Sequence, residues 1–276
     1  MNFLVTKVVI KLYLRNNNRL MDSKSPKNIS ALIITLNEEI HMNELLTDLA
    51  FADEVIVVDS FSKDQTKAIS ESFSNVKFIE HKFDNYTAQR NFAIDQAKND
   101  WILFLDADER LTPELKEEII TTVNQNATSN AYLFPRLFMF QHKVLHFSGW
   151  QTDKIFRLFN KNFAKYTSER LVHEKLDVQG GIGCLKNKLI HYSYSDFESY
   201  KGKMRTYGKL KAQEKFNKNI NPSFLHAMLH PTYNFLYSYL IRLGFLDGKK
   251  GVIICYLNAY SVYIRYQELD KLWSKK

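Results

Sequence analysis

The stretch WILFLDADERL, residues 101–111, joins an unbroken apolar run to three acidic side chains. Its first five residues fit a buried strand of a parallel sheet. Asp106 and Asp108 follow directly, and side chains two residues apart on an extended segment point the same way. Two such carboxylates repel each other unless a cation or hydrogen-bond donors neutralise them. We therefore expect this strand end to hold a hard divalent ion. The alternative is that both Asp residues only shape the turn before a helix at Thr112.

Three apolar runs upstream have the same character, and each is followed by a polar turn and a segment with helical spacing. The expected strands are residues 31–35, 55–58 and 76–79, and the expected helices start at caps Asn37, Asp64 and Thr112, with a further helix over residues 86–98. Strands that alternate with helices predict a parallel sheet with right-handed crossovers. Ligands bind beyond the carboxyl ends of such strands, where Thr35, Asp59 and the Asp106/Asp108 pair are placed.

The second half of the chain has a different pattern. Aromatic-rich short runs over residues 131–192 predict hairpins and antiparallel strands, and from Phe197 the pattern is helical, with breaks at Pro222 and Pro231. The predicted class is α/β: a mostly parallel sheet flanked by helices, a small antiparallel portion and a helical C-terminal extension. The corresponding divisions are a disordered or amphipathic leader over residues 1–28, a domain over 29–192 and a basic, aromatic-rich extension over 193–276.

Composition excludes several classes of protein. Two cysteines, far apart, exclude a disulfide framework or a Cys-rich zinc module, and no run of 18 apolar residues occurs. The net charge of +8 is uneven: basic against acidic residues number six to one over 1–28, 18 to 25 over 29–200, and 14 to four over 201–276. The acidic middle argues against a nucleic-acid partner. The basic ends favour an anionic membrane surface or a phosphorylated substrate nearby.

Four motifs follow one another in the first half of the chain: ITLNEE at 34–39, ADEVIVVDS with SxDxT over 52–66, QRNFA at 89–93 and LDADERL at 105–111. Their order and spacing resemble family 2 glycosyltransferases of the GT-A fold. Shorter motifs in the second half are similar to the lipooligosaccharide and lipopolysaccharide core β-1,4-glucosyltransferase subgroup: GW at 149–150, RLF at 157–159, VHE at 172–174, His191 and GFLDG at 244–248.

The resemblance implies an inverting enzyme that moves a sugar, glucose in that subgroup, from a UDP-linked donor to a hydroxyl of a lipopolysaccharide-core or other envelope glycolipid. It implies a divalent metal, Mg²⁺ or Mn²⁺. The nucleotide-binding positions it indicates are Thr35, Asn37, Glu38, Asp59, Arg90 and Asp106, and the metal positions are Asp106, Asp108 and His191. Arg90 could instead be a surface charge paired with Glu80 or Asp84, and His191 could be a structural side chain.

An inverting transfer needs a general base that takes the proton of the acceptor hydroxyl. The candidates are Glu174, whose place in the VHE motif resembles the family's base, and Asp153. The alternative for Asp153 is an ion pair with Arg157, four residues on. For Glu174 it is a surface pair with Lys175 or Arg170.

The basic extension suggests peripheral contact with an anionic membrane, and thus an enzyme at the cytoplasmic face where a lipid-linked acceptor is presented. Packing on the sheet or a dimer interface is the alternative for these helices. For the whole protein we also consider a nucleotidyltransferase and a non-catalytic nucleotide- or glycan-binding protein. The acidic, glycine-free turn over residues 35–39 argues against the first, and the intact Asp106/Asp108 pair argues against the second.

Overall fold

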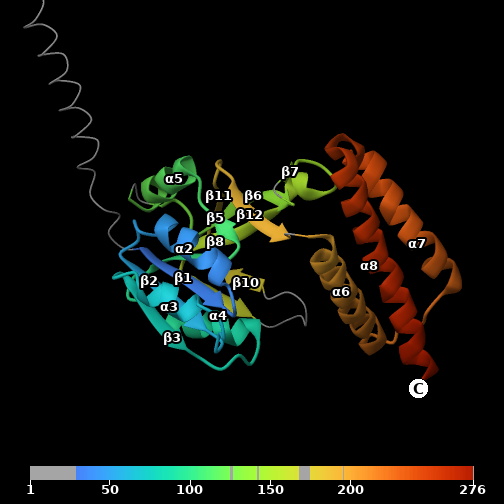
Figure 1. Ribbon diagram of the computed structural model, residues 1–276, viewed down its shortest axis with the longest axis horizontal. Coiled ribbons are helices and arrows are strands. Elements are labelled where there is room, and N and C mark those ends of the chain that lie inside the picture. Colours follow the sequence, from blue (N-terminus) through green and yellow to red (C-terminus); the bar gives the residue numbers. More distant parts are fainter. Residues whose placement is uncertain (1–28, 125–126, 142, 168–174, 195, 276) are drawn as a thin grey trace, which may run out of the picture.

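The computed structural model describes residues 29–124, 127–141, 143–167, 175–194 and 196–275. The expected leader lies outside these residues. Two parts are visible in Figure 1: a sheet region, residues 29–194, and a helical extension, residues 196–275. Among the described residues, no helix combines enough length with enough apolar character to span a bilayer. The exact domain boundaries stay a prediction.

Four parallel strands form the first half of the sheet, in the order β3-β2-β1-β4. They are β1 (Ile29–Thr35), β2 (Glu54–Asp59), β3 (Val76–Glu80) and β4 (Trp101–Asp106). The register places Thr35 opposite Asp59 and Ile34 opposite Asp106. The expected gathering of polar strand ends is therefore confirmed.

Helices cover both faces of these strands, because each helix has one apolar side. They are α2 (Glu39–Asp48), α3 (Thr66–Glu71), α4 (Tyr86–Asp95) and α5 (Pro113–Asn124). Met42 of α2 and Leu115 of α5 pack in the core on one face, and Ala93 of α4 packs on the other. The Thr112 cap is confirmed, since its hydroxyl accepts a hydrogen bond from the Leu115 N–H at 3.2 Å.

The expected cap at Asn37 is wrong. Helix α2 follows Glu38, while Asn37 adopts a φ of +55°, a conformation that Asn tolerates better than most residues. Its amide oxygen instead accepts a hydrogen bond from the Lys63 N–H at 2.8 Å. The cap expected at Asp64 is displaced as well: α3 follows Gln65, and Asp64 accepts from the N–H groups of Thr66 and Glu39.

The second half of the sheet mixes directions. Its strands are β5 (Glu109–Arg110), β6 (Ala131–Phe140), β7 (Lys143–Leu145), β8 (Lys154–Asn160), β11 (Ile182–Cys184) and β12 (Leu189–Tyr194), with β9 (Ala164–Thr167) and β10 (Lys175–Val178) forming a separate pair. Strand β8 runs antiparallel between β4 and β6, as expected. Two further strands of this stretch, β11 and β12, pair with β6 in parallel, which the sequence pattern did not predict. The long connection after β6 makes these parallel returns geometrically accessible.

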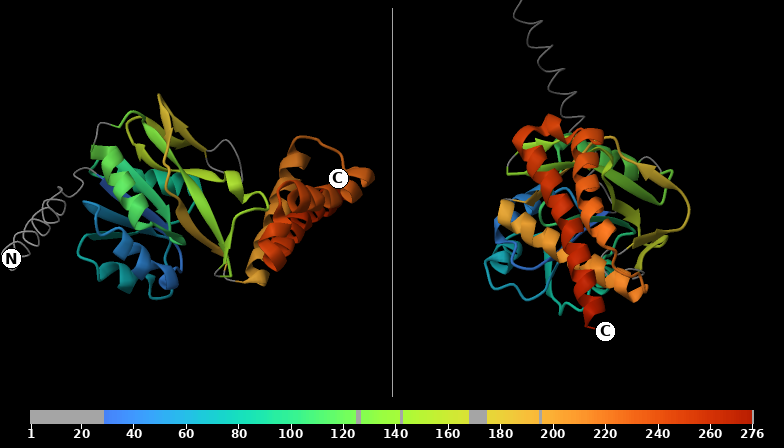
Figure 2. Two further views of the ribbon diagram at one scale, coloured as in Figure 1. Left: turned by 90° about the horizontal axis from the view of Figure 1, so that it is seen from above. Right: turned by 90° about the vertical axis from the view of Figure 1, so that its right-hand side faces the viewer.

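The helical extension consists of α6 (Phe197–Asn217), α7 (Phe224–Leu236), the π-helical turn η2 (Tyr237–Ile241), the 3-10 turn η3 (Gly244–Asp247) and α8 (Gly248–Ser274). Helix α8 packs on both α6 and α7, and α6 is nearest the sheet (Figures 1 and 2). A Cβ on Gly208 would lie 2.7 Å from the Ser261 carbonyl oxygen, so the α6–α8 contact requires glycine there. The break expected at Pro231 is wrong: α7 continues through it.

One carboxylate fastens the extension to the sheet region. Asp247 accepts hydrogen bonds from the N–H groups of His146 and Phe147, each at 3.0 Å. The side chain is buried, so these donors replace the water that would otherwise solvate its charge. The GFLDG motif therefore has a structural use at this junction.

Candidate active site

Asp106, at the end of β4, is held by two arginines. Arg90 of α4 donates from Nη2 to Asp106 Oδ1 at 2.9 Å, and Arg157 of β8 binds the other oxygen. Arg90 is buried, with its guanidinium 4.7 Å from the Phe104 ring centroid and 5.4 Å from that of Tyr166. The surface-pair alternative for Arg90 is therefore wrong.

Arg157 also neutralises a carboxylate that the sequence reasoning did not select. Its Nε lies 2.7 Å from Oε2 of Glu109, and both side chains are almost wholly buried. The carboxylate of Glu109 also accepts the backbone N–H of Asp106 at 3.1 Å. Burial disfavours the charged form, yet the charges of Arg157 and Arg90 hold the pKa of Asp106 well below its usual range. Asp106 therefore stays ionised and is fixed in position.

Asp108 and His191 form a second pair. His191 Nε2 lies 3.2 Å from Asp108 Oδ2, and the two side chains are 16% and 25% exposed. Strand β12 positions the histidine, since His191 lies opposite Glu109 in the ladder and Tyr192 N–H donates to the Asp108 carbonyl at 2.8 Å. Burial is outweighed by the hydrogen bond and charge of His191, which lower the pKa of Asp108.

The donor set fits a divalent ion only in part. Across the described ranges, no three His, Cys, Asp or Glu side chains are grouped as a ready-made metal site. Asp108 and His191 supply one oxygen and one nitrogen side by side. The oxygens of Asp106 face arginines instead. An ion bound here would thus take one oxygen and one nitrogen ligand from the protein and the rest from a diphosphate and water.

The loops after β1 and β2 are hydrogen-bonded to each other beside Asp108 and His191. Asp59 accepts from the N–H and the hydroxyl of Ser62 at 2.7 and 2.5 Å, and the Ser62 hydroxyl accepts from the Asn37 N–H at 2.7 Å. Both loops contain a left-handed residue, Asn37 and Phe61. At the strand end below them, the buried Thr35 hydroxyl has no partner among the described residues.

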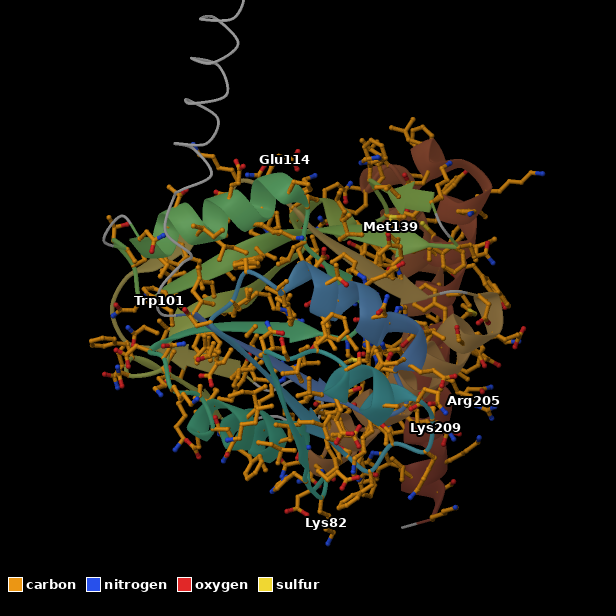
Figure 3. All side chains as sticks on the ribbon, turned by 60° about the vertical axis from the view of Figure 1, so that its left-hand side comes forward. Lys82, Trp101, Glu114, Met139, Arg205 and Lys209 are labelled. Carbon is orange, nitrogen blue, oxygen red and sulfur yellow. The ribbon has the colours of Figure 1, made fainter. Side chains whose placement is uncertain are left out.

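Glu38 lies between these loops and the two carboxylates of Asp106 and Asp108. Burial, followed by the charges of Asp108, Asp64 and Asp106, raises the pKa of Glu38 to about 7. The charge of Lys203, from α6, lowers the pKa of both Glu38 and Asp108. Figure 3 places Trp101, the first residue of β4, on the opposite side of the molecule from Arg205 and Lys209 of α6. The carboxyl ends of the strands thus face α6.

Asp153 is an ion-paired side chain, but its partner differs from the expected one. Its two oxygens accept from Nε and Nη2 of Arg136 at 2.8 and 3.1 Å. Arg157 is not its partner because the side chain of Arg157 is committed to Asp106 and Glu109. Glu174, the other candidate base, lies outside the described residues.

Three contributors were not assigned to the site from sequence: Glu109, Arg157 and Lys203. Glu109 lies three residues after Asp106, and Arg157 lies in the RLF motif, so the sequence contained an indication that each belongs to the site. A buried carboxylate pair requires a buried cation. Lys203 carried no such signal within the lysine-rich run.

Comparison with known proteins agrees with this geometry. The family model described as Glycosyl transferase family 2 matches residues 30–178. An uncharacterized glycosyltransferase of Rickettsia bellii is 32% identical over 258 residues, covering 89% of this chain and 87% of the relative. The lipopolysaccharide core biosynthesis glycosyltransferase LpsC of Rhizobium meliloti is 25% identical, covering 86% and 93%.

Among solved structures, a mannosyltransferase from Pyrobaculum calidifontis in complex with GDP-Man and Mn²⁺ has the same fold. The TM-score is 0.53 at 14% identity, covering 96% of this chain and 95% of the other. The family match spans more than half of the 276 residues and includes the strand ends that gather Thr35, Asp59, Asp106 and Asp108. The chain therefore belongs to glycosyl transferase family 2, and it is a glycosyltransferase with the GT-A fold.

Proposed function

We propose that the enzyme is an inverting hexosyltransferase that moves a sugar, glucose, from a UDP-linked donor to a hydroxyl of a lipopolysaccharide-core or related envelope glycolipid. The observation that carries the donor site is the Asp108/His191 pair, 3.2 Å apart, beside an Asp106 already neutralised by two arginines. The acceptor class is supported by the likeness to LpsC, named for lipopolysaccharide core biosynthesis.

The nucleotide would lie across the ends of β1, β2 and β4. Thr35 offers a buried hydroxyl that has no partner among the described residues, and Asp59 and Asn37 belong to the hydrogen-bonded loops at the same edge. Arg90 acts on the site through Asp106, which it holds in place. Lys203 adds positive charge from α6, facing the side where a diphosphate would bind.

A divalent ion would be held by Asp108 and His191, with Asp106 close by. Bound there, the ion would neutralise the negative charge that develops on the departing nucleoside diphosphate. Imidazole nitrogen suits Mn²⁺ better than Mg²⁺, so we expect Mn²⁺ to be preferred.

The chemical step needs one more carboxylate. The acceptor oxygen forms a bond to the anomeric carbon as the bond from that carbon to the diphosphate oxygen breaks. The diphosphate leaves with the electron pair, and the hydroxyl proton passes to the base. Of the two candidates, Glu174 is the better base, because both oxygens of Asp153 are engaged by Arg136. Asp153, paired with Arg136, would then have a structural role on the acceptor side of the site.

The test is nucleotide release from a panel of UDP- and GDP-sugars, with Mn²⁺ and a core glycolipid acceptor. Asp108→Asn should lower kcat/KM at least ~100-fold and Glu174→Gln should lower kcat by about as much. Asp153→Asn should have a smaller effect on kcat and should lower the stability. Lys67→Met, at an exposed pair with Glu80, serves as the control. Unchanged turnover in Asp108→Asn would contradict the proposed site.

A further inference from the structure

The helical extension carries most of the exposed large apolar side chains. Of 22 such residues within the described part of the chain, 14 fall between residues 224 and 263. They form what we call the apolar face: Phe224, Leu225, Met228, Leu229, Tyr233, Leu236, Leu240, Ile241, Leu243, Phe245, Leu246, Val252, Tyr256 and Tyr263. These residues run in sequence from α7 through η2 and η3 into α8, as far as Tyr263.

Helix α7 shows why this face needs a partner. Its 13 residues include no Asp, Glu, Lys or Arg, and none is fully buried. Partly covered residues recur at helical spacing and mark the stripe that packs on α8, while Phe224 and Leu225 are 81% and 62% exposed. The helix therefore leaves large apolar side chains exposed on the sides that α8 does not cover. Exposed patches of this kind mark sites of association.

The charge around the apolar face fits an anionic bilayer. Residues 219–246 contain no Asp or Glu and one Arg, Arg242, while the exposed Asp270 of α8 lines a hollow together with Phe224 and Tyr263. Exposed lysines flank this stretch at Lys218 and Lys249. The face also carries Tyr233, Tyr256 and Tyr263, whose amphipathic rings suit the boundary between head groups and acyl chains.

We propose that the apolar face docks the enzyme onto anionic phospholipid, with α7 lying in the plane of the interface. Apolar side chains enter the acyl boundary and the flanking lysines and arginine contact lipid phosphates, as in amphipathic surface helices. This mode agrees with the absence, among described helices, of one that could span a bilayer.

The position of the face leaves the catalytic side open. Helices α6 and α8 lie between α7 and the sheet region (Figures 1 and 2). Docking through α7 therefore does not cover the strand ends that carry Asp106 and Asp108. Lipid binding through this face is independent of the transfer chemistry and can be measured without it.

The test is cosedimentation of the full chain with phosphatidylglycerol vesicles and, in parallel, with phosphatidylcholine vesicles. The test variant is Leu225→Gln/Leu229→Gln. The matched control is Phe163→Gln/Ile182→Gln, two comparably exposed apolar side chains on the sheet region. All four side chains are exposed, so both variants should fold, which circular dichroism checks.

We expect the wild type and the control to bind phosphatidylglycerol vesicles, and the test variant to partition roughly tenfold less. High salt should weaken the binding without abolishing it, because the apolar contribution is not screened. Wild-type protein that stays in the supernatant, or equal binding by both variants, would overturn the proposal. So would a wild-type dimer in sedimentation equilibrium that the test variant converts to monomer without any vesicle binding, since the occupant would then be a second copy.

Discussion

The sheet region and the helical extension place their charged and apolar side chains in opposite ways. In the sheet region, Arg157 and Glu109 are almost fully buried, and each buried charge meets a partner. In α7, no charged residue occurs, and apolar side chains such as Leu229 face outward. The first arrangement prepares a fixed site for a charged ligand. The second leaves apolar surface exposed to water, and burying that surface against a partner would be favourable.

The largest effect is expected where a buried charge loses its partner. Arg157→Met should lower the free energy of unfolding by ~3–5 kcal/mol, because Glu109 and Asp106 would remain buried with less compensation. Urea unfolding measures the difference. Lys67→Met, which removes an exposed pair with Glu80, should change the stability by less than about 1 kcal/mol. Equal stability of the two variants would show that the arginine is dispensable for the fold.

The same leucine-to-alanine change should lower the stability by different amounts in the two regions. Leu103, in β4, is fully buried, so Leu103→Ala should cost ~2–5 kcal/mol. Leu229 is 54% exposed, so Leu229→Ala should cost less than about 1 kcal/mol. Thermal or urea unfolding of both variants, without lipid, makes the comparison. A large loss in Leu229→Ala would mean that the apolar face is already covered in solution.

Glu38 should make the stability depend on pH. Its pKa of about 7 lies above the ordinary value of 4.5, so the folded state holds a proton that the unfolded state has released between these values. Stability due to this group is therefore present below pH 4.5 and lost as the pH rises to about 7. Metal-free Glu38→Gln should exceed the wild type by ~1–2 kcal/mol at pH 8, after allowance for solvent screening, and match it near pH 4.5.

Unfolding of both proteins across this pH range, in the presence of a chelator, checks the sign. The difference between Glu38→Gln and wild type should grow with pH and level off above pH 7. A difference that is constant, or that shrinks as the pH rises, would contradict the raised pKa.

The smallest effect on stability is expected at Thr35. Thr35→Val replaces a buried hydroxyl that has no partner among the described residues with a methyl group, so stability should be unchanged or rise by up to about 1 kcal/mol. Nucleotide affinity should fall several-fold at the same time, if the hydroxyl binds the nucleotide as proposed. Calorimetric titration with UDP measures it. Loss of stability together with unchanged affinity would assign Thr35 to the fold alone.

Much of the sheet region could be predicted from sequence because its signals are local. Each apolar run ends at a polar residue, and the parallel register places these residues next to one another, as with Thr35 and Asp59. What could not be predicted depends on contacts between distant segments. The Arg157–Asp106 pair joins residues 51 apart, and the charge of Lys203 acts on Asp108 from a helix that follows the whole sheet.

Local rules also failed where tertiary contacts outweighed them. Asn37 does not cap α2, because its side chain accepts a hydrogen bond from the Lys63 N–H in the neighbouring loop. Helix α7 continues through Pro231 while it packs on α8. The sequence suggested membrane contact for the basic, aromatic-rich extension as a whole. Within that extension the charge of Lys203 lowers the pKa of Asp108, while apolar side chains of α7 are exposed.

Nucleotide-dependent thermal stability tests the Asp108/His191 site most directly. Melting of wild type, Asp108→Asn and the exposed control Asp177→Asn would be followed with UDP and Mn²⁺, together and separately. At ligand well above Kd, we expect wild type and control to gain several degrees with UDP and Mn²⁺ together, since ~100-fold excess is worth ~2.7 kcal/mol. Asp108→Asn should gain little. Equal stabilisation of Asp108→Asn, or no response of folded wild type to any nucleoside diphosphate, would contradict a donor site at these strand ends.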